Sequence, residues 1–167
     1  MKKINPRELQ GNIFELIGDK WMLITAAKDC GAYNTMTASW GGMGIMWGKP
    51  VASCVVRPVR YTYEFMESAE YFTLTFFPEK YREALNMLGV KSGRDCDKIA
   101  EAGLTPVKLN CDKIINFEES EITLVCKKIY YQDINPDNFV DKDLDKNYPQ
   151  KDYHRFYYGE IVEAYIK

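Results

Sequence analysis

The chain has 167 residues, of which 46% are hydrophobic and 28% charged, and its net charge is −2. This length predicts a single domain over residues 1–167, and the composition excludes a disordered chain. A near-neutral charge argues against a nucleic-acid-binding protein, which needs a basic surface. No apolar run approaches the roughly 20 residues that cross a bilayer. Residues 1–6 lack the apolar core of a signal peptide, so we expect neither a nucleic-acid nor a membrane partner.

Histidine and cysteine restrict the chemistry further. His154 is the only histidine, so a His-rich zinc site is impossible and a histidine-based triad has little support. The five cysteines form no CxxC pair, which predicts reduced, buried thiols in a cytoplasmic protein. No GxSxG motif is present, and the acidic residues show no metal-ligand spacing. We therefore expect no metal site and no hydrolase chemistry.

The first half of the chain predicts strands separated by turns. Residues up to Gly11 predict an irregular arm or a short helix. Apolar and β-branched runs predict strands over Trp21–Lys28, Asn34–Trp40, Val51–Arg57 and Glu70–Phe77. Four glycines between Gly41 and Gly48 predict a loop in that stretch. Thr62 before acidic residues marks a helix start, and apolar spacing predicts a second helix over Glu79–Leu88, which Gly89 ends.

The second half adds one short helix and more strands. Val90–Asp97 predicts a polar loop, after which Asp95 or Asp97 caps a helix that Gly103 closes. Strands are expected over Val107–Leu109, Lys113–Phe117, Glu121–Gln132 and Tyr153–Ile166, with a turn at 110–112, a surface loop over 135–150 and a bulge or bend at Gly159. Many strands without regular βαβ alternation predict a mainly β fold, an antiparallel barrel with a few appended short α-helices.

Two basic segments suggest a phosphate site. Arg57 and Arg60 stand just before the helix that starts near Thr62, and a helix N-terminus favours an anion. The loop Lys91–Arg94 adds cations, a hydroxyl group and a glycine. Each segment alone is also compatible with a solvated basic turn.

A third segment suggests a flat ligand. Thr35–Gly42 places small hydroxyl residues on a strand that runs into glycines, which lets the backbone approach a planar heteroaromatic ring. Trp40 could pack on such a ring. The alternative is a threonine-rich edge strand before a tight loop.

Five motifs in this order resemble the flavin reductase-like family, the FMN-binding split barrels that include flavoredoxin. They are NTMTASWGG (34–42), KPVASCVVRPVRYTYEF (49–65), FTLTFF (72–77), KSGRDCDKI (91–99) and DYHRFYYGEI (152–161). The resemblance implies an antiparallel, Greek-key-like split β-barrel. It also implies a homodimer that holds FMN near the subunit interface.

The resemblance assigns site residues by position. Those implied to line the flavin ring and its polar rim are Thr37, Ala38, Ser39 and Trp40. The residues implied to place backbone groups and a cationic side chain beside the ring and the ribityl chain are Cys54, Val55, Val56 and Arg57. Those implied to meet the phosphate are Arg60, Tyr61, Thr62, Lys91, Ser92 and Gly93. His154 and Tyr157 are implied to reach the ring or the partner subunit. The catalytic residues stay unassigned.

The function that follows is an FMN-dependent oxidoreductase of flavin reductase type. NAD(P)H would be a transient co-substrate that delivers hydride to FMN, and electrons would pass to an unknown acceptor. A different class is a non-catalytic FMN-binding electron carrier or flavin store. A pyridoxamine-phosphate-oxidase-like enzyme ranks last, because its substrate signature is not evident.

Overall fold

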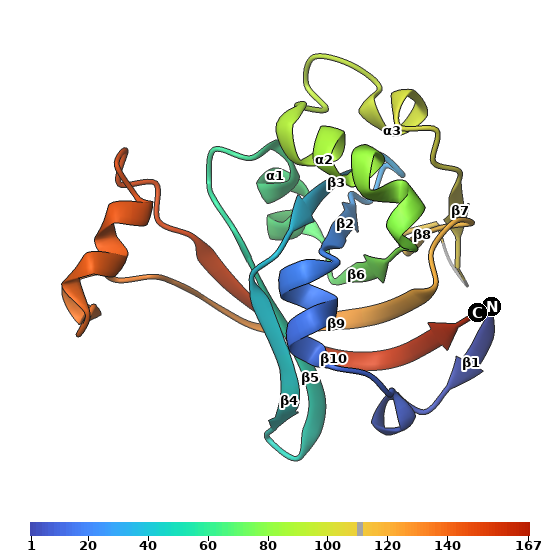
Figure 1. The fold of residues 1–167 in the computed structure, drawn as a ribbon, viewed down its shortest axis with the longest axis horizontal. Coiled ribbons are helices and arrows are strands. Elements are labelled where there is room, and N and C mark those ends of the chain that lie inside the picture. Colours follow the sequence, from blue (N-terminus) through green and yellow to red (C-terminus); the bar gives the residue numbers. More distant parts are fainter. Residues whose placement is uncertain (110–111) are drawn as a thin grey trace.

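A computed structural model describes residues 1–109 and 112–167. One curved antiparallel sheet forms the body of the molecule (Figure 1), with the strand order β3-β2-β6-β9-β10-β5-β4 and with β1 added on β10. The strands are β1 (Lys2–Ile4), β2 (Met22–Ala27), β3 (Tyr33–Ala38), β4 (Gly41–Met46), β5 (Lys49–Val56), β6 (Tyr71–Phe76), β9 (Ile122–Asp133) and β10 (Arg155–Ile166). A separate small hairpin pairs β7 (Pro106–Lys108) with β8 (Ile115–Phe117).

The described residues contain three α-helices. They are α1 (Tyr61–Ser68), α2 (Arg82–Val90) and α3 (Lys98–Glu101). Short 3₁₀ or π helices occupy Pro6–Glu8, Glu15–Asp19, Glu79–Tyr81, Pro136–Asn138 and Lys142–Asn147. Helix α1 contacts β2 and β3, and α2 contacts β3. In the described residues, no helix has the length and apolar character needed to cross a bilayer.

The core explains why the central strands look continuously apolar in sequence. Every residue of β2 is buried, because successive side chains enter different clusters. Met22 and Ile24 join the larger cluster with Phe72, whereas Leu23 packs with Leu85 under α2. A strand that is covered on both faces loses the polar–apolar alternation of a half-buried strand. The mainly β prediction, with antiparallel strands and few helices, is confirmed.

The predicted loop over the glycine run is wrong. Gly41–Met46 is the strand β4, paired with β5. A Cβ on Gly41 would lie 2.3 Å from the Ser53 carbonyl oxygen, so glycine permits this close approach of two strands. Trp47 and Gly48 have φ angles of 51° and 72°, typical of the two-residue turn that closes a tight hairpin. Gly41 therefore allows the two strands to pair closely, and Gly48 allows the tight turn between them.

Of three smaller expectations, one is met in part, one fails and one holds. The N-terminal segment contains strand β1, paired with the end of β10, as well as a helical turn. Helix α2 continues through Gly89 to Val90. The bulge at Gly159 is confirmed, since the β9–β10 register shifts there and a Cβ would lie 2.6 Å from Cys126 Cβ.

The segment between β9 and β10, residues 134–154, projects from the body (orange to red in Figure 1), and we call it the β9–β10 loop. It contains two 3₁₀ turns, which agrees with the expected surface loop. The expected turn at 110–112 lies partly outside the described residues.

Of the described cysteines, Cys54 and Cys126 are buried as expected, and Cys96 is partly buried. Cys30 is exposed, which corrects the expectation for that residue. Cys111 lies outside the described residues.

Candidate functional site

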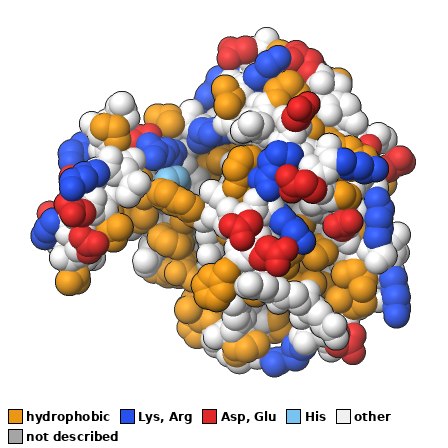
Figure 2. All heavy atoms as spheres, viewed as in Figure 1, with side chains coloured by type: hydrophobic (Ala, Val, Ile, Leu, Met, Phe, Trp, Pro, Cys, Tyr) orange, Lys and Arg blue, Asp and Glu red, His pale blue; other side chains and the backbone are white. Residues whose placement is uncertain are grey.

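A cavity of about 360 Å³ opens between β3, β5 and α2. Figure 2 shows the surface hollowed between the β9–β10 loop and the body, with hydrophobic side chains gathered there. Eight residues implied by the family resemblance line this cavity: Thr37, Ala38, Ser39, Trp40, Val55, Arg57, Arg60 and His154. Six further residues complete the lining: Trp21, Met36, Leu85, Asn86, Gly89 and Val90. We call it the ring cavity.

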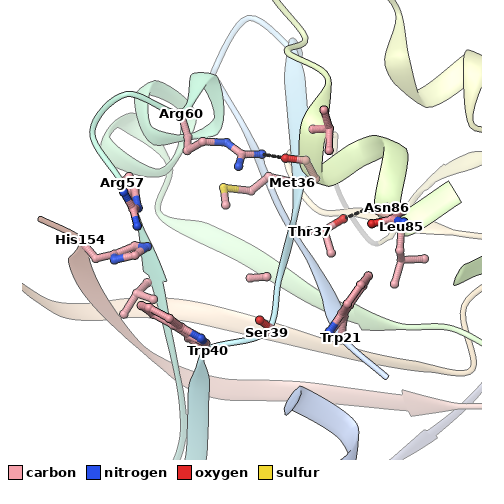
Figure 3. Close-up of a pocket in the computed structure, with 14 residues that line it drawn as sticks. Trp21, Met36, Thr37, Ser39, Trp40, Arg57, Arg60, Leu85, Asn86 and His154 are labelled. Atoms are coloured by element: carbon pink, nitrogen blue, oxygen red, sulfur yellow. Dashed lines mark hydrogen bonds between the residues drawn. The ribbon is translucent and has the colours of Figure 1, made fainter. Parts of the chain in front are cut away.

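One wall of the ring cavity is the contact between β3 and α2. The Thr37 hydroxyl donates to the Leu85 carbonyl oxygen at 2.5 Å, as Figure 3 shows. A Cβ on Gly89 would lie 3.4 Å from Thr37 Cβ, an ordinary van der Waals contact, which shows how closely the helix packs on the strand. Ser39 and Trp40 follow directly where β3 ends. The hydroxyl-rich segment is thus held at the cavity by its own helix contact.

The opposite wall carries Trp40 and His154, which lie close together in Figure 3. Their ring centroids are 5.2 Å apart, and Trp40 is 47% exposed. His154 Nδ1 and the Tyr148 hydroxyl are 2.9 Å apart and hydrogen-bonded. Burial, helped by the positive charge of Arg57, lowers the pKa of His154 to about 4. The imidazole is therefore neutral near pH 7 and acts there as a hydrogen-bonding group rather than a cation.

The two predicted arginines lie on the same side of the ring cavity but have different partners. Arg57 donates to both carboxylate oxygens of Asp152, at 2.9 and 3.0 Å, and to the Asn147 carbonyl oxygen at 2.8 Å. Its charge is therefore paired within the β9–β10 loop. Arg60 donates to the Gly89 carbonyl oxygen at 2.8 Å, drawn as a dashed line in Figure 3. Burial, and next the charge of Arg57, lower the pKa of Arg60.

A second cavity of about 180 Å³ shares Arg60 and Val90 with the ring cavity. Five residues implied to bind phosphate line it: Arg60, Tyr61, Thr62, Lys91 and Ser92. Helix α1 begins here at Tyr61, and no side chain caps its N-terminus. Tyr63 N–H bonds the Arg60 carbonyl oxygen at 2.9 Å, which leaves the N–H groups of Tyr61 and Thr62 and the partial positive charge of the helix end for an anion. We call this the anion cavity.

The remaining contacts of the anion cavity fix its walls. Thr62 is buried, and its hydroxyl oxygen accepts from Asn34 Nδ2 at 2.8 Å. Lys91 is bonded through Nζ to Glu101 at 2.5 Å, on the exposed side. Gly93 lies in a neighbouring cavity, where a Cβ would come within 2.2 Å of Asn34 Oδ1. The structure thus brings together the segments near positions 60 and 91, which are distant in sequence.

Three implied site residues lie in the core, so their side chains line neither of these cavities. Cys54 and Val56 are fully buried in the larger apolar cluster. Strand alternation explains this placement, because Val55 between them faces the ring cavity. Tyr157 is also fully buried, and its hydroxyl donates to Glu67 at 2.5 Å. Backbone contacts of Cys54 and Val56 with a cofactor stay a prediction.

Sequence reasoning did not find several lining residues. Trp21 has a φ of 66° directly before β2, and Asn86 belongs to the exposed side of a helix, so neither carried a recognisable signal. The sequence pattern predicts only that Lys98 belongs to a capped helix, whereas in the structure Lys98 lines the anion cavity and is 3% exposed. The sign of Lys98 burial in the sequence was its apolar neighbour Ile99 within a short helix.

Among the described residues, no group of three His, Cys, Asp or Glu side chains could hold a metal ion.

The comparisons with known proteins agree with this fold. A strongly curved antiparallel barrel with short appended helices is the architecture of the flavin-binding split barrels. Residues 16–167 match the model of the flavin reductase like domain, so the chain belongs to the flavin reductase-like family. The resemblance seen in the sequence and the split-barrel fold are therefore confirmed. The comparison with curated proteins gives no significant match.

Solved structures with the same fold are distant in sequence. An FMN-binding domain of a flavin reductase-like enzyme from Shewanella baltica OS155 has a TM-score of 0.70 at 18% identity, over 99% of this chain and 76% of that one. Flavoredoxin of Desulfovibrio vulgaris (Miyazaki F) has a TM-score of 0.67 at 22% identity, over 88% and 69%. Nitrilotriacetate monooxygenase component B from Bacillus cereus has a TM-score of 0.68 at 18% identity, over 99% and 81%.

Proposed function

We propose that this protein binds FMN and works as an oxidoreductase of flavin reductase type, with NAD(P)H as the transient hydride donor. One observation carries the proposal. The ring cavity and the anion cavity are adjacent and share Arg60 and Val90. A planar ring linked to a phosphate would occupy both cavities at once, whereas riboflavin would leave the anion cavity unused.

The anion cavity fits a phosphate because Arg60 and the start of α1 have no acidic partner there, although Lys91 is paired with Glu101. Helix α1 presents uncapped N–H groups there. Arg60 donates to a carbonyl oxygen, and no carboxylate of the described chain forms an ion pair with it. Charge-assisted hydrogen bonds from guanidinium to phosphate are about twice as strong as neutral ones. Arg60, Tyr61, Thr62, Lys91 and Ser92 are therefore the residues proposed to hold the phosphate.

The ring cavity fits a flat heteroaromatic group. Hydroxyl and backbone groups of 37–39 border it, and the Trp40 ring forms one edge. FMN, when bound, supplies the redox chemistry by accepting a hydride from NAD(P)H and passing electrons to an acceptor. The protein's own contribution is to bind and orient. His154, neutral near pH 7, offers a hydrogen-bonding edge without adding charge.

We further propose that the protein is a homodimer with the cofactor near the subunit interface. The hairpin β4–β5 presents exposed apolar side chains, and Trp47 at its tip is 62% exposed. Ile45 and Met46 beside it are exposed as well. Burial of this surface by a second copy would remove apolar area from water.

The first experiment is a visible spectrum of the purified protein, followed by FMN titration and anaerobic addition of NADH or NADPH. We expect a bound flavin spectrum and bleaching by one of the nucleotides. A colourless protein that takes up no FMN would contradict the whole proposal.

A second candidate is a non-catalytic FMN-binding electron carrier or flavin store. The fold comparisons accommodate it, because one of the similar structures is a flavoredoxin and another is a monooxygenase component. A protein that holds FMN which neither nucleotide bleaches would favour the carrier. Steady-state NADH and NADPH oxidation with and without added FMN separates the two candidates further.

A further inference from the structure

Lys98 is a buried lysine that lines the anion cavity. It is the first residue of α3, next to Asp97, whose carboxylate accepts from Ala100 N–H at 3.2 Å and caps the helix. Lys98 is 3% exposed. Its Nζ donates to the Leu88 carbonyl oxygen at 2.9 Å and to the Lys91 carbonyl oxygen at 3.0 Å. The ammonium group therefore holds both sides of the turn that ends α2.

The charge of Lys98 has no acidic counterpart. Of the described carboxylates, none forms an ion pair with Lys98 or with Arg60, although both line the same cavity. Burying a charge is costly unless an opposite charge or several hydrogen bonds compensate it. The partly buried Arg60 nearby raises this cost, because its positive charge disfavours the charged form of Lys98. An anion in the cavity would relieve both costs.

We propose that Lys98 is a positioning residue of the phosphate site, holding the Leu88–Lys91 turn in place and supplying positive charge beneath the phosphate of FMN. This inference rests on the proposed function. An ammonium group has three donors, and two of them are used on carbonyl oxygens, which leaves one for the anion. Arg60 holds the carbonyl oxygen of Gly89 in the same turn, so both cations fix one backbone segment.

The surroundings of Lys98 make its charge depend on pH in the accessible range. Burial, and next the charge of Arg60, lower the pKa of Lys98 to about 8, while Cys96 acts in the opposite direction. The ammonium of Lys91, whose carbonyl oxygen it contacts, is paired with Glu101. Without an anion Lys98 therefore loses its proton as the pH rises through about 8. FMN affinity is expected to fall above that pH, whereas riboflavin affinity stays level.

The chain offers a matched control in Lys128. Its Nζ also donates to two carbonyl oxygens at a helix end, those of Met66 at 2.5 Å and Glu67 at 2.9 Å. Burial lowers the pKa of Lys128 as well. Lys128 lies on β9, outside both cavities. A Lys128→Met variant therefore removes a similar structural contact without touching the anion cavity.

The experiment measures dissociation constants of FMN and riboflavin at pH 7 and pH 9 for the wild type, Lys98→Met and Lys128→Met. We expect Lys98→Met to weaken FMN about 10- to 100-fold, in line with a lost charge-assisted contact, and to leave riboflavin within about twofold. Its FMN affinity should no longer fall between pH 7 and pH 9. Lys128→Met should keep the wild-type ratio and pH profile.

The outcomes separate this inference from the proposed function. If the wild type binds FMN no more tightly than riboflavin, the phosphate site itself is refuted. If the wild type prefers FMN but Lys98→Met keeps that preference and its pH dependence, only the role of Lys98 is overturned. Should Lys98→Met fail to fold, the wild-type profile decides, because an FMN-to-riboflavin ratio that is constant from pH 7 to pH 9 contradicts a titrating lysine at the site.

Discussion

Arg57 and Arg60 are three positions apart, yet they have different hydrogen-bond partners and therefore different roles. Nη1 of Arg57 donates to both carboxylate oxygens of Asp152, and this contact ties the β9–β10 loop to the rim of the ring cavity. The guanidinium of Arg60 meets only a carbonyl oxygen and faces the anion cavity. Both side chains looked equivalent in sequence, because a basic residue carries no mark of the partner that will neutralise it.

At the residue scale, Arg60→Ala is expected to weaken FMN about 10- to 100-fold and riboflavin much less. Arginine holds phosphate through charge-assisted hydrogen bonds, which riboflavin cannot form. Titration with both flavins measures the difference. Arg82→Ala is the control for charge removal outside the anion cavity; because Arg82 lies over the Trp21 ring of the ring cavity, any effect should be equal for the two flavins. Equal losses for the two ligands would contradict a phosphate role for Arg60.

His154 predicts a pH dependence of stability. Its pKa is about 4 in the folded protein, below its value of 6.5 in the unfolded chain, so the unfolded state binds more protons between these values. The free energy of unfolding should therefore fall as the pH drops from 6.5 toward 4, by about 2 kcal/mol from this group. Urea unfolding at pH 7 and pH 4.5 should show a smaller acid loss for His154→Gln. An identical loss in both proteins would contradict a depressed pKa.

At the scale of elements, glycines decide how closely the strands approach. Gly159→Ala should destabilise the fold by several kcal/mol, because its Cβ would overlap Cys126 and Phe72 inside the core. Gly44→Ala on β4 is the control, since nothing lies within 4 Å of the added Cβ. Thermal unfolding compares the two variants. Similar midpoints would show that the core at Gly159 can adjust.

The β9–β10 loop depends on its anchor at Asp152. Asp152→Asn should leave Arg57 without its carboxylate and loosen the loop, so proteases should cut near Lys142 and Lys146 several times faster. Asp143→Asn, which removes an exposed pair with Lys146, should have little effect, because exposed ion pairs contribute little to stability. Limited trypsin digestion followed by mass spectrometry provides the measurement. Unchanged cleavage would contradict an anchoring role for Asp152.

At the scale of the whole molecule, the proposed dimer depends on the β4–β5 hairpin. Trp47→Glu places a charge in the apolar surface and should shift the protein to a monomer in sedimentation velocity experiments. Val140→Glu, at a residue that is 99% exposed on the β9–β10 loop, tests whether any added charge has this effect. Dissociation by Val140→Glu but not by Trp47→Glu would move the interface to the loop.

Much of the fold followed from local patterns in the chain. The strands at 22–27, 71–76 and 122–133 and the helix after 82 are strongly patterned, and the structure has them within a few residues. The strand β4 was missed because closely spaced glycines favour a loop. The strand forms because β4 pairs with β5, where Gly41 lies against the backbone of the distant Ser53. Local propensity contains no information about such a partner.

The sequence alone determined the family, the mainly β split barrel and two basic segments suited to an anion. Its ordered motifs and apolar runs are local properties, so they can be read without coordinates. Only the tertiary structure decided that Arg60 and Lys98 share one cavity and that Arg57 is paired with Asp152. It also placed Cys54, Val56 and Tyr157 in the core. Charge pairing and burial arise between residues that are far apart in the chain, and the fold alone sets those distances.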